Sequence, residues 1–131
     1  MNLEVQPLVH AEISVIPIIS SRGDKENAIS DSGMSKYIAK AFDAIRKIEG
    51  INVVLTSMGT HIETRDFDKI LQAIDATHDS LRGEGNITRI VSTIRIDERR
   101  DKSANFDDRI RSVHKKLQKQ VSQIDYSNRT I

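Results

Sequence analysis

Apolar residues either alternate with polar ones or recur every three to four positions in seven stretches of the chain. Alternation and β-branched residues predict four strands, at residues 11–18, 51–57, 60–64 and 88–97. Helical spacing predicts three amphipathic helices, which begin near Met34, Phe67 and Ser103 and end before Gly50, before Gly83 and near Ile124.

The order strand, helix, strand, strand, helix, strand is the split βαβ pattern of ferredoxin-like folds, and one further helix follows it. We therefore predict an α+β fold, a ferredoxin-like βαββαβ sandwich with an additional C-terminal helix, as one domain over residues 11–124. Residues 1–10 form an N-terminal extension, residues 20–33 a loop without apolar periodicity, and residues 125–131 a C-terminal tail.

Both faces of the predicted sheet carry apolar side chains. In the first strand, Ile13 and Val15 point to one face while Ile16 and Ile18 point to the other. Helices cover only one face of such a sheet, so we expect another subunit to bury the second face. The third helix has an apolar stripe of its own, which predicts a further subunit contact.

Composition narrows the classes of partner. The chain has 131 residues, 30% of them charged, and a formal net charge of +1, which disfavours binding to nucleic acid or to an anionic membrane. No apolar run approaches the roughly 20 residues that span a bilayer, and cysteine is absent. The five aromatic residues lie on predicted helices or in the tail, so the sheet offers no platform for stacking RNA bases. We expect a cytoplasmic protein with no membrane or nucleic-acid partner.

A hydroxyl-rich stretch at the predicted hairpin, residues 56–63, gives the strongest signal for a binding site. Polar side chains on a half-buried strand cost free energy unless they find partners, so such a cluster indicates a lined pocket or an interface. The alternative is that Ser57 and Thr60 satisfy backbone or cross-strand hydrogen bonds while Glu63 points to water.

Charged residues gather after the last predicted strand. Arg95, Arg99 and Arg100 precede the third helix, and a helix N-terminus beside arginines could bind a phosphate or sulfate. The alternative is a network of salt bridges, or a subunit contact, that also includes Asp97 and Asp101.

The histidines predict no metal site. His61 and Glu63 share one side of a strand, but two groups make a poor metal site. His78 lies on the apolar face of the second helix, where it is either a hydrogen-bonded core residue or a ligand-binding group. We expect His10 and His114 to be solvated.

Several short motifs together resemble the small thiamine-binding protein family over residues 11–117. In chain order they are AEISVIPI at 11–18, SKYI at 35–38, SMGTHIE at 57–63, His78 and IRIDERRDK at 94–102. The resemblance implies a ferredoxin-like protomer whose dimers share a continuous sheet and pair into a homotetramer. It also implies a non-catalytic protein that requires no cofactor and binds thiamine or its hydroxymethylpyrimidine moiety.

The implied ligand can be compared with the residues of these motifs. An aminopyrimidine presents a ring acceptor and an amine donor on a flat apolar face, so its site needs hydroxyl, carbonyl or carboxylate groups between aliphatic walls. The candidate ligand-binding residues are Ser57, Met58, Thr60, Glu63, His78 and Asp97.

Two other functions compete with this prediction. Hydrolases of this fold such as acylphosphatases need a phosphate-cradling glycine-rich loop after the first strand, and no loop of that type is found. A regulatory or scaffolding oligomer that binds another small metabolite or anion at subunit contacts fits the second apolar sheet face equally well.

Overall fold

The computed structural model describes residues 7–20 and 31–124, and these form the predicted succession of elements. The predicted C-terminal tail, most of the N-terminal extension and most of the loop after the first strand lie outside the described residues. The elements are β1 (Val9–Ile19), α1 (Asp31–Arg46), β2 (Asn52–Thr56), β3 (Gly59–Thr64), α2 (Phe67–Arg82), β4 (Ile87–Glu98) and α3 (Phe106–Ile124).

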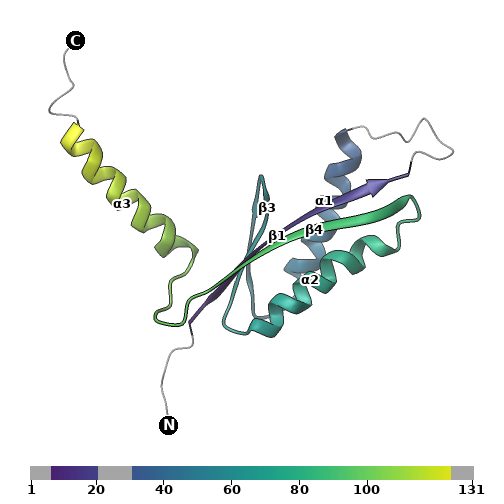
Figure 1. Cartoon of the computed structure of the whole chain (residues 1–131), viewed down its shortest axis with the longest axis horizontal. Helices are drawn as coiled ribbons and strands as arrows, with labels where there is room; N and C mark the ends of the chain where they lie inside the picture. The colour runs from purple at the N-terminus through teal and green to yellow at the C-terminus, as the bar shows by residue number, and fades with distance from the viewer. Residues whose placement is uncertain (1–6, 21–30, 125–131) are drawn as a thin grey trace, which may run out of the picture.

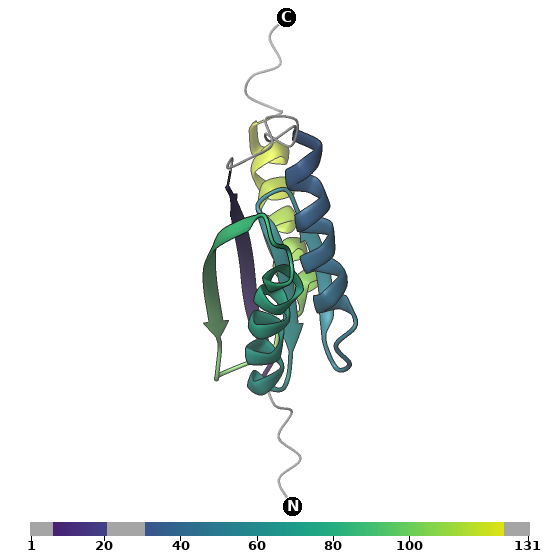
Figure 2. The same ribbon diagram turned by 90° about the vertical axis from the view of Figure 1, so that its right-hand side faces the viewer.

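The four strands form one antiparallel sheet in the order β2-β3-β1-β4. Helices α1 and α2 lie side by side on one face of this sheet, whereas α3 extends away from it (Figures 1 and 2). This arrangement confirms the α+β, ferredoxin-like fold with an additional C-terminal helix.

The core lies between the sheet and the α1–α2 layer. Ile13 of β1, Ile62 of β3, Ile45 of α1 and Ala73 of α2 pack into one buried cluster. Each large aliphatic side chain buried in this way stabilises the fold by about 1.5–3 kcal/mol. Alternate residues of β1 and β3 therefore face the helices, and the residues between them face the opposite, open side of the sheet.

Strand β1 is longer than the sequence predicted at both ends. It begins at Val9, inside the predicted extension, and continues through Pro17 to Ile19. Beyond Ile13, β1 pairs only with β4, because Gly59 is the first residue of β3 and the hairpin turn comes before it. A proline is tolerated in a strand where its missing N–H would face no partner, so β1 continues past Pro17.

The β2–β3 hairpin turns tightly at Ser57 and Met58. The hydroxyl of Thr56 accepts hydrogen bonds from the backbone N–H groups of Met58 and Gly59, each at 3.2 Å, and donates to the carbonyl of Gly59 at 3.0 Å. A Cβ atom at Gly59 would lie 2.7 Å from the carbonyl oxygen of Ile13. Only glycine lets the hairpin approach β1 this closely.

Helix α3 is attached to the open side of the sheet at its first turn. The backbone N–H of Phe106 donates to one carboxylate oxygen of Glu63 at 2.8 Å, and the Asn52 side chain donates to the other at 2.8 Å. Asn105 and Asp108 cap the helix reciprocally, each accepting from the other's backbone N–H. The sequence predicted that this helix begins near Ser103, and its cap is Asn105, two residues later.

His10 supports the same attachment and is only 3% exposed, so the prediction that it is solvated was wrong. Its Nε2 lies 2.7 Å from the carbonyl oxygen of Ala104, which can only accept, so this nitrogen carries the proton. In the neutral ring Nδ1 then accepts, and His61 Nε2, 3.2 Å away, must be the donor. The Phe106 ring packs edge-on against His61, with ring centroids 4.1 Å apart. His114 is exposed, as predicted.

Burial lowers the pKa of His61 below its ordinary value of 6.5, and the neighbouring His10 lowers that pKa further. The folded protein therefore favours the neutral imidazole at this position. The attachment of α3 is built around two neighbouring histidine rings, and the lowered pKa of His61 favours its neutral form.

Substitution of Gly59 with alanine is expected to destabilise the fold. The added Cβ would collide with the backbone of β1, which cannot move aside as a flexible side chain would, and overpacking of this kind costs about 1–3 kcal/mol. Urea unfolding followed by circular dichroism measures the loss. Gly83→Ala is the control, because nothing lies within 4 Å of the added Cβ there. Equal stability of the two variants would contradict the close approach.

A second expectation concerns pH. The unfolded chain binds a proton at His61 more readily than the folded protein does, so the free energy of unfolding should fall as pH drops below about 6.5. His61→Gln keeps an amide donor for His10 and removes the titrating ring. Its free energy of unfolding should therefore decline less than that of the wild type between about pH 7.5 and about pH 5.5. Identical declines would show that His61 does not carry the effect.

Candidate functional site

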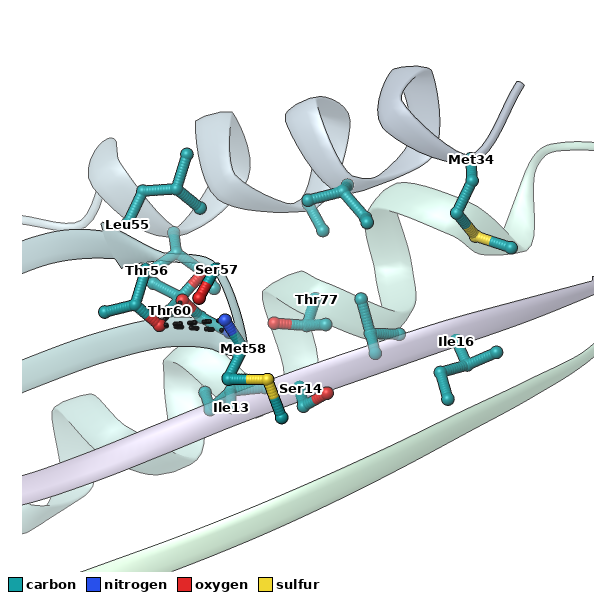
Figure 3. A pocket seen from close by; sticks show the side chains of 15 residues that line it. Ile13, Ser14, Ile16, Met34, Leu55, Thr56, Ser57, Met58, Thr60 and Thr77 are labelled. Carbon is teal, nitrogen blue, oxygen red and sulfur yellow. Dashed lines mark hydrogen bonds between the residues drawn. The ribbon is translucent and has the colours of Figure 1, made fainter. Parts of the chain in front are cut away.

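A cavity of about 400 Å³ lies between β1, α1 and the β2–β3 hairpin (Figure 3). This volume is within the range typical of small-molecule sites. The lining residues come from five elements and the hairpin turn, and Figure 3 labels ten of them: Ile13, Ser14, Ile16, Met34, Leu55, Thr56, Ser57, Met58, Thr60 and Thr77.

Hydroxyl groups supply the polar side chains of the cavity. Thr56 is occupied by the hairpin turn, and Thr77 donates to the carbonyl of Ala73 at 2.8 Å. Within the described part of the chain, no group hydrogen-bonds to the hydroxyls of Ser14, Ser57 and Thr60. These three hydroxyls are available to a ligand.

The walls of the cavity are aliphatic. Met58 extends from the hairpin turn toward β1 beside Ser14, and it is 74% exposed, so it overhangs the opening (Figure 3). Met34 and Ile38 line the cavity from the first turns of α1. None of the described lining residues carries a charge. The cavity is therefore suited to a flat, uncharged group of mixed polarity.

The structure brings together three of the predicted ligand-binding residues, Ser57, Met58 and Thr60, at this cavity. Sequence reasoning missed Ser14 and Thr77, which reach it from β1 and α2. Each is a small hydroxyl residue with apolar neighbours, Ser14 between Ile13 and Val15 in the chain and Thr77 among the buried residues of α2, and that pattern was the available signal.

The other three predicted residues lie elsewhere. Glu63 is 5% exposed and points to the open side of the sheet, opposite Thr60, where both of its oxygens hold other elements. His78 Nε2 lies 2.8 Å from the hydroxyl of Ser92, and Asp97 forms a salt bridge with Arg109. A role for these residues in ligand binding remains a prediction from the sequence.

The three predicted anion-binding arginines lie apart from one another, and Arg99 lines a hollow at the start of α3. Arg99 is bonded to Asp101 at 2.6 Å and 3.1 Å, Arg100 is exposed, and Arg95 lines a hollow on the open sheet face. The N–H of Phe106 is already bonded to Glu63. The guanidinium of Arg99 lowers the pKa of Asp101, as expected for the salt-bridge alternative.

Arg109, in the first turns of α3, holds the pKa of the Asp97 carboxyl below its usual range, mainly through their hydrogen bond.

In the described ranges, no three histidine or acidic side chains gather as a metal site would require. Likewise, no helix there is long and apolar enough to cross a membrane.

Comparison with known proteins gives a consistent result. The family model of the thiamine-binding proteins matches residues 11–114. A UPF0045 protein of Methanothermobacter thermautotrophicus is 29% identical over 110 residues, which cover 84% of this chain and all of that protein. A UPF0045 protein of Methanocaldococcus jannaschii is 31% identical over 105 residues, covering 80% of this chain and 91% of that protein.

Solved structures show the same fold. The crystal structure of the Methanocaldococcus jannaschii protein superposes with a TM-score of 0.62 and 30% identity, over 82% of this chain and 96% of that one. A Thermotoga maritima protein, named for a proposed role in thiamine biosynthesis or salvage, superposes with a TM-score of 0.59 and 19% identity, over 82% and 99% of the two chains. On its sequence and its fold, this chain belongs to the thiamine-binding protein family.

Proposed function

We propose that this protein binds thiamine non-catalytically, and that the pyrimidine moiety of the ligand occupies the cavity between β1, α1 and the hairpin. The observation that carries the proposal is the composition of this cavity, whose described lining residues combine aliphatic walls with three available hydroxyls and carry no charge. Membership of the thiamine-binding family and the name of the Thermotoga maritima neighbour support the choice of ligand.

The chemistry of an aminopyrimidine fits these groups. Its flat face packs against Ile13, Ile38 and Met58, and its ring nitrogens and amine exchange hydrogen bonds with Ser57 and Thr60. A hydroxyl can donate and accept, so these side chains suit a ring that does both. A binding role agrees with the lining, in which the described residues supply no carboxylate, histidine or lysine for proton transfer.

The remainder of thiamine is a cationic thiazolium that can carry phosphate. Among the described residues, no basic side chain lines the cavity to hold a phosphate, and no acidic one lines it to hold the cation. Both parts of the ligand therefore extend toward solvent past Met58. We expect thiamine and its phosphate esters to bind with similar affinity.

The second function, a regulatory or scaffolding oligomer, is favoured by the exposed apolar surfaces. On α3, Ile110, Val113 and Leu117 are 56%, 58% and 48% exposed and recur at helical spacing. On the open sheet face, Ile16 and Val91 are also exposed. We propose that these surfaces join copies of the chain into a homotetramer, as a dimer of dimers, around the thiamine-binding protomers.

Isothermal titration calorimetry with thiamine, its mono- and diphosphate and hydroxymethylpyrimidine tests the proposed ligand. All four should bind, and Thr60→Val should weaken their binding by about 1–2 kcal/mol because a buried hydrogen bond is lost without a change of shape. Thr93→Val is the matched control, because Thr93 lies on β4 outside the cavity. The absence of binding heat and of any thermal shift with all four compounds would refute the proposal.

Light scattering coupled to gel filtration tests the assembly. The wild type should elute with the mass of four chains, whereas the double variant Val113→Gln, Leu117→Gln should give a smaller mass because its apolar stripe is interrupted. Lys115→Gln, on the opposite side of the same helix, should leave the mass unchanged. A monomeric wild type, or a double variant that keeps the full mass, would contradict the role of α3.

A further inference from the structure

The wall of the cavity includes a stretch of β1 that has a neighbouring strand on one side only. β3 pairs with β1 from Val9↔Thr64 to Ile13↔Thr60, whereas β4 stays paired with β1 as far as Ile19. The hairpin does not continue along β1, because its turn folds back onto the hydroxyl of Thr56. Within the described residues, the hairpin-side edge of β1 is therefore unpaired after residue 13.

The close approach of Gly59 shows which backbone groups lie on this edge. The carbonyl oxygen of Ile13 lies 2.7 Å from the Cβ position of Gly59, so it points toward the hairpin. The N–H and C=O of a strand residue point to the same side, and this side alternates from one residue to the next. The N–H and C=O of Val15 therefore also point to the hairpin side, where no strand follows.

Pro17 supports this assignment independently. It lies two residues after Val15, so its backbone groups point to the same side as those of Val15. It is paired with Ile90 in a β1–β4 ladder whose register is regular from residue 9 to residue 18. A proline has no N–H to donate, so it fits such a ladder only where the residues before and after it make the hydrogen bonds to the neighbouring strand. Residues 13, 15 and 17 therefore direct their backbone groups away from β4 and toward the cavity side.

Val15 is one of the cavity-lining residues, so its free donor and acceptor border the proposed ligand site. An aminopyrimidine carries a ring nitrogen acceptor beside an amine donor, in complementary order to the N–H and C=O of one strand residue. We propose that the ligand's pyrimidine edge pairs with the backbone of Val15, as a neighbouring strand would. This inference rests on the proposed function and names the group that selects the ligand.

The edge fits a small ring better than an added strand. Two residues beyond Val15, Pro17 offers no N–H on this side, and a proline blocks continued pairing by another chain. The apolar side chains of Met58 and Leu55 also line the cavity. The gap admits one donor–acceptor pair between apolar walls.

Recognition by backbone has a consequence that recognition by hydroxyls lacks. A hydroxyl can rotate to donate or to accept, so Ser57 and Thr60 alone would tolerate a ring whose donor and acceptor are exchanged. The backbone of Val15 cannot exchange its N–H and C=O. Because the thiazolium extends toward solvent past Met58, the pyrimidine ring cannot turn over. In this fixed orientation, a ring with a keto oxygen in place of the amine, and a protonated nitrogen beside it, would set donor against donor and acceptor against acceptor.

Titration of the full chain with thiamine and with its keto analogue, oxythiamine, tests this pairing. We expect oxythiamine to bind at least about 100-fold more weakly, because both backbone groups would be left unsatisfied. Similar affinities would overturn the pairing and leave the proposed function intact. Failure of both compounds to bind would overturn the proposed function, and the pairing with it.

Two variants at one position provide a second test. Val15→Pro removes the N–H without breaking a bond to β4, and Val15→Ala keeps the backbone while shortening the side chain. Thiamine affinity should fall at least about 10-fold in Val15→Pro and change less than about 3-fold in Val15→Ala. Circular dichroism checks that both variants fold. If Val15→Pro is folded and binds thiamine normally, the pairing is wrong; if it does not fold, the oxythiamine comparison decides.

Discussion

The structure depends on a mismatch in length between two neighbouring strands. β1 has 11 residues and β3 has six, and their pairing stops where Gly59 meets the carbonyl of Ile13. A sheet normally pairs the backbone groups of an inner strand on both sides, and here one side is left open between two layers of apolar side chains. The cavity exists because the hairpin is short, so its position is fixed by one turn and one glycine.

The alternation of side chains along β3 assigns different tasks to its two faces. Thr60 faces the cavity, while His61 and Glu63 hold the first turn of α3 on the other side of the sheet. The six residues of β3 thus line the cavity on one face of the sheet and hold α3 on the other. Because register fixes both faces together, a shift of one residue would disrupt both.

Much of the fold was predictable from the sequence because it rests on local periodicity. The apolar spacing of Phe67, Ile70 and Ile74 defines α2, and Asp66 caps that helix as its side chain suggests. The errors occurred where a distant contact decides the outcome. Pro17 suggests the end of a strand until the length of β3 is known, and His10 suggests a solvated residue until Ala104 and Phe106 cover it.

The site was only partly predictable for the same reason. One turn of the chain keeps three of the cavity residues together, namely Ser57, Met58 and Thr60. Tertiary packing alone brings Ser14 and Thr77 to them. Glu63 shows the limit of residue chemistry as a guide. A carboxylate beside hydroxyls is a reasonable pyrimidine ligand, yet the alternation of the strand places it on the opposite face from Thr60.

The separation of the two faces also separates their chemistry. Ionic and imidazole side chains near β3, among them His61, Asp97 and Arg109, lie on the open side at the start of α3. The cavity side has hydroxyls and backbone groups that do not titrate near neutral pH. A change of pH therefore acts first on the attachment of α3 and on any contact that α3 makes, while the donor and acceptor pattern that faces the ligand stays constant.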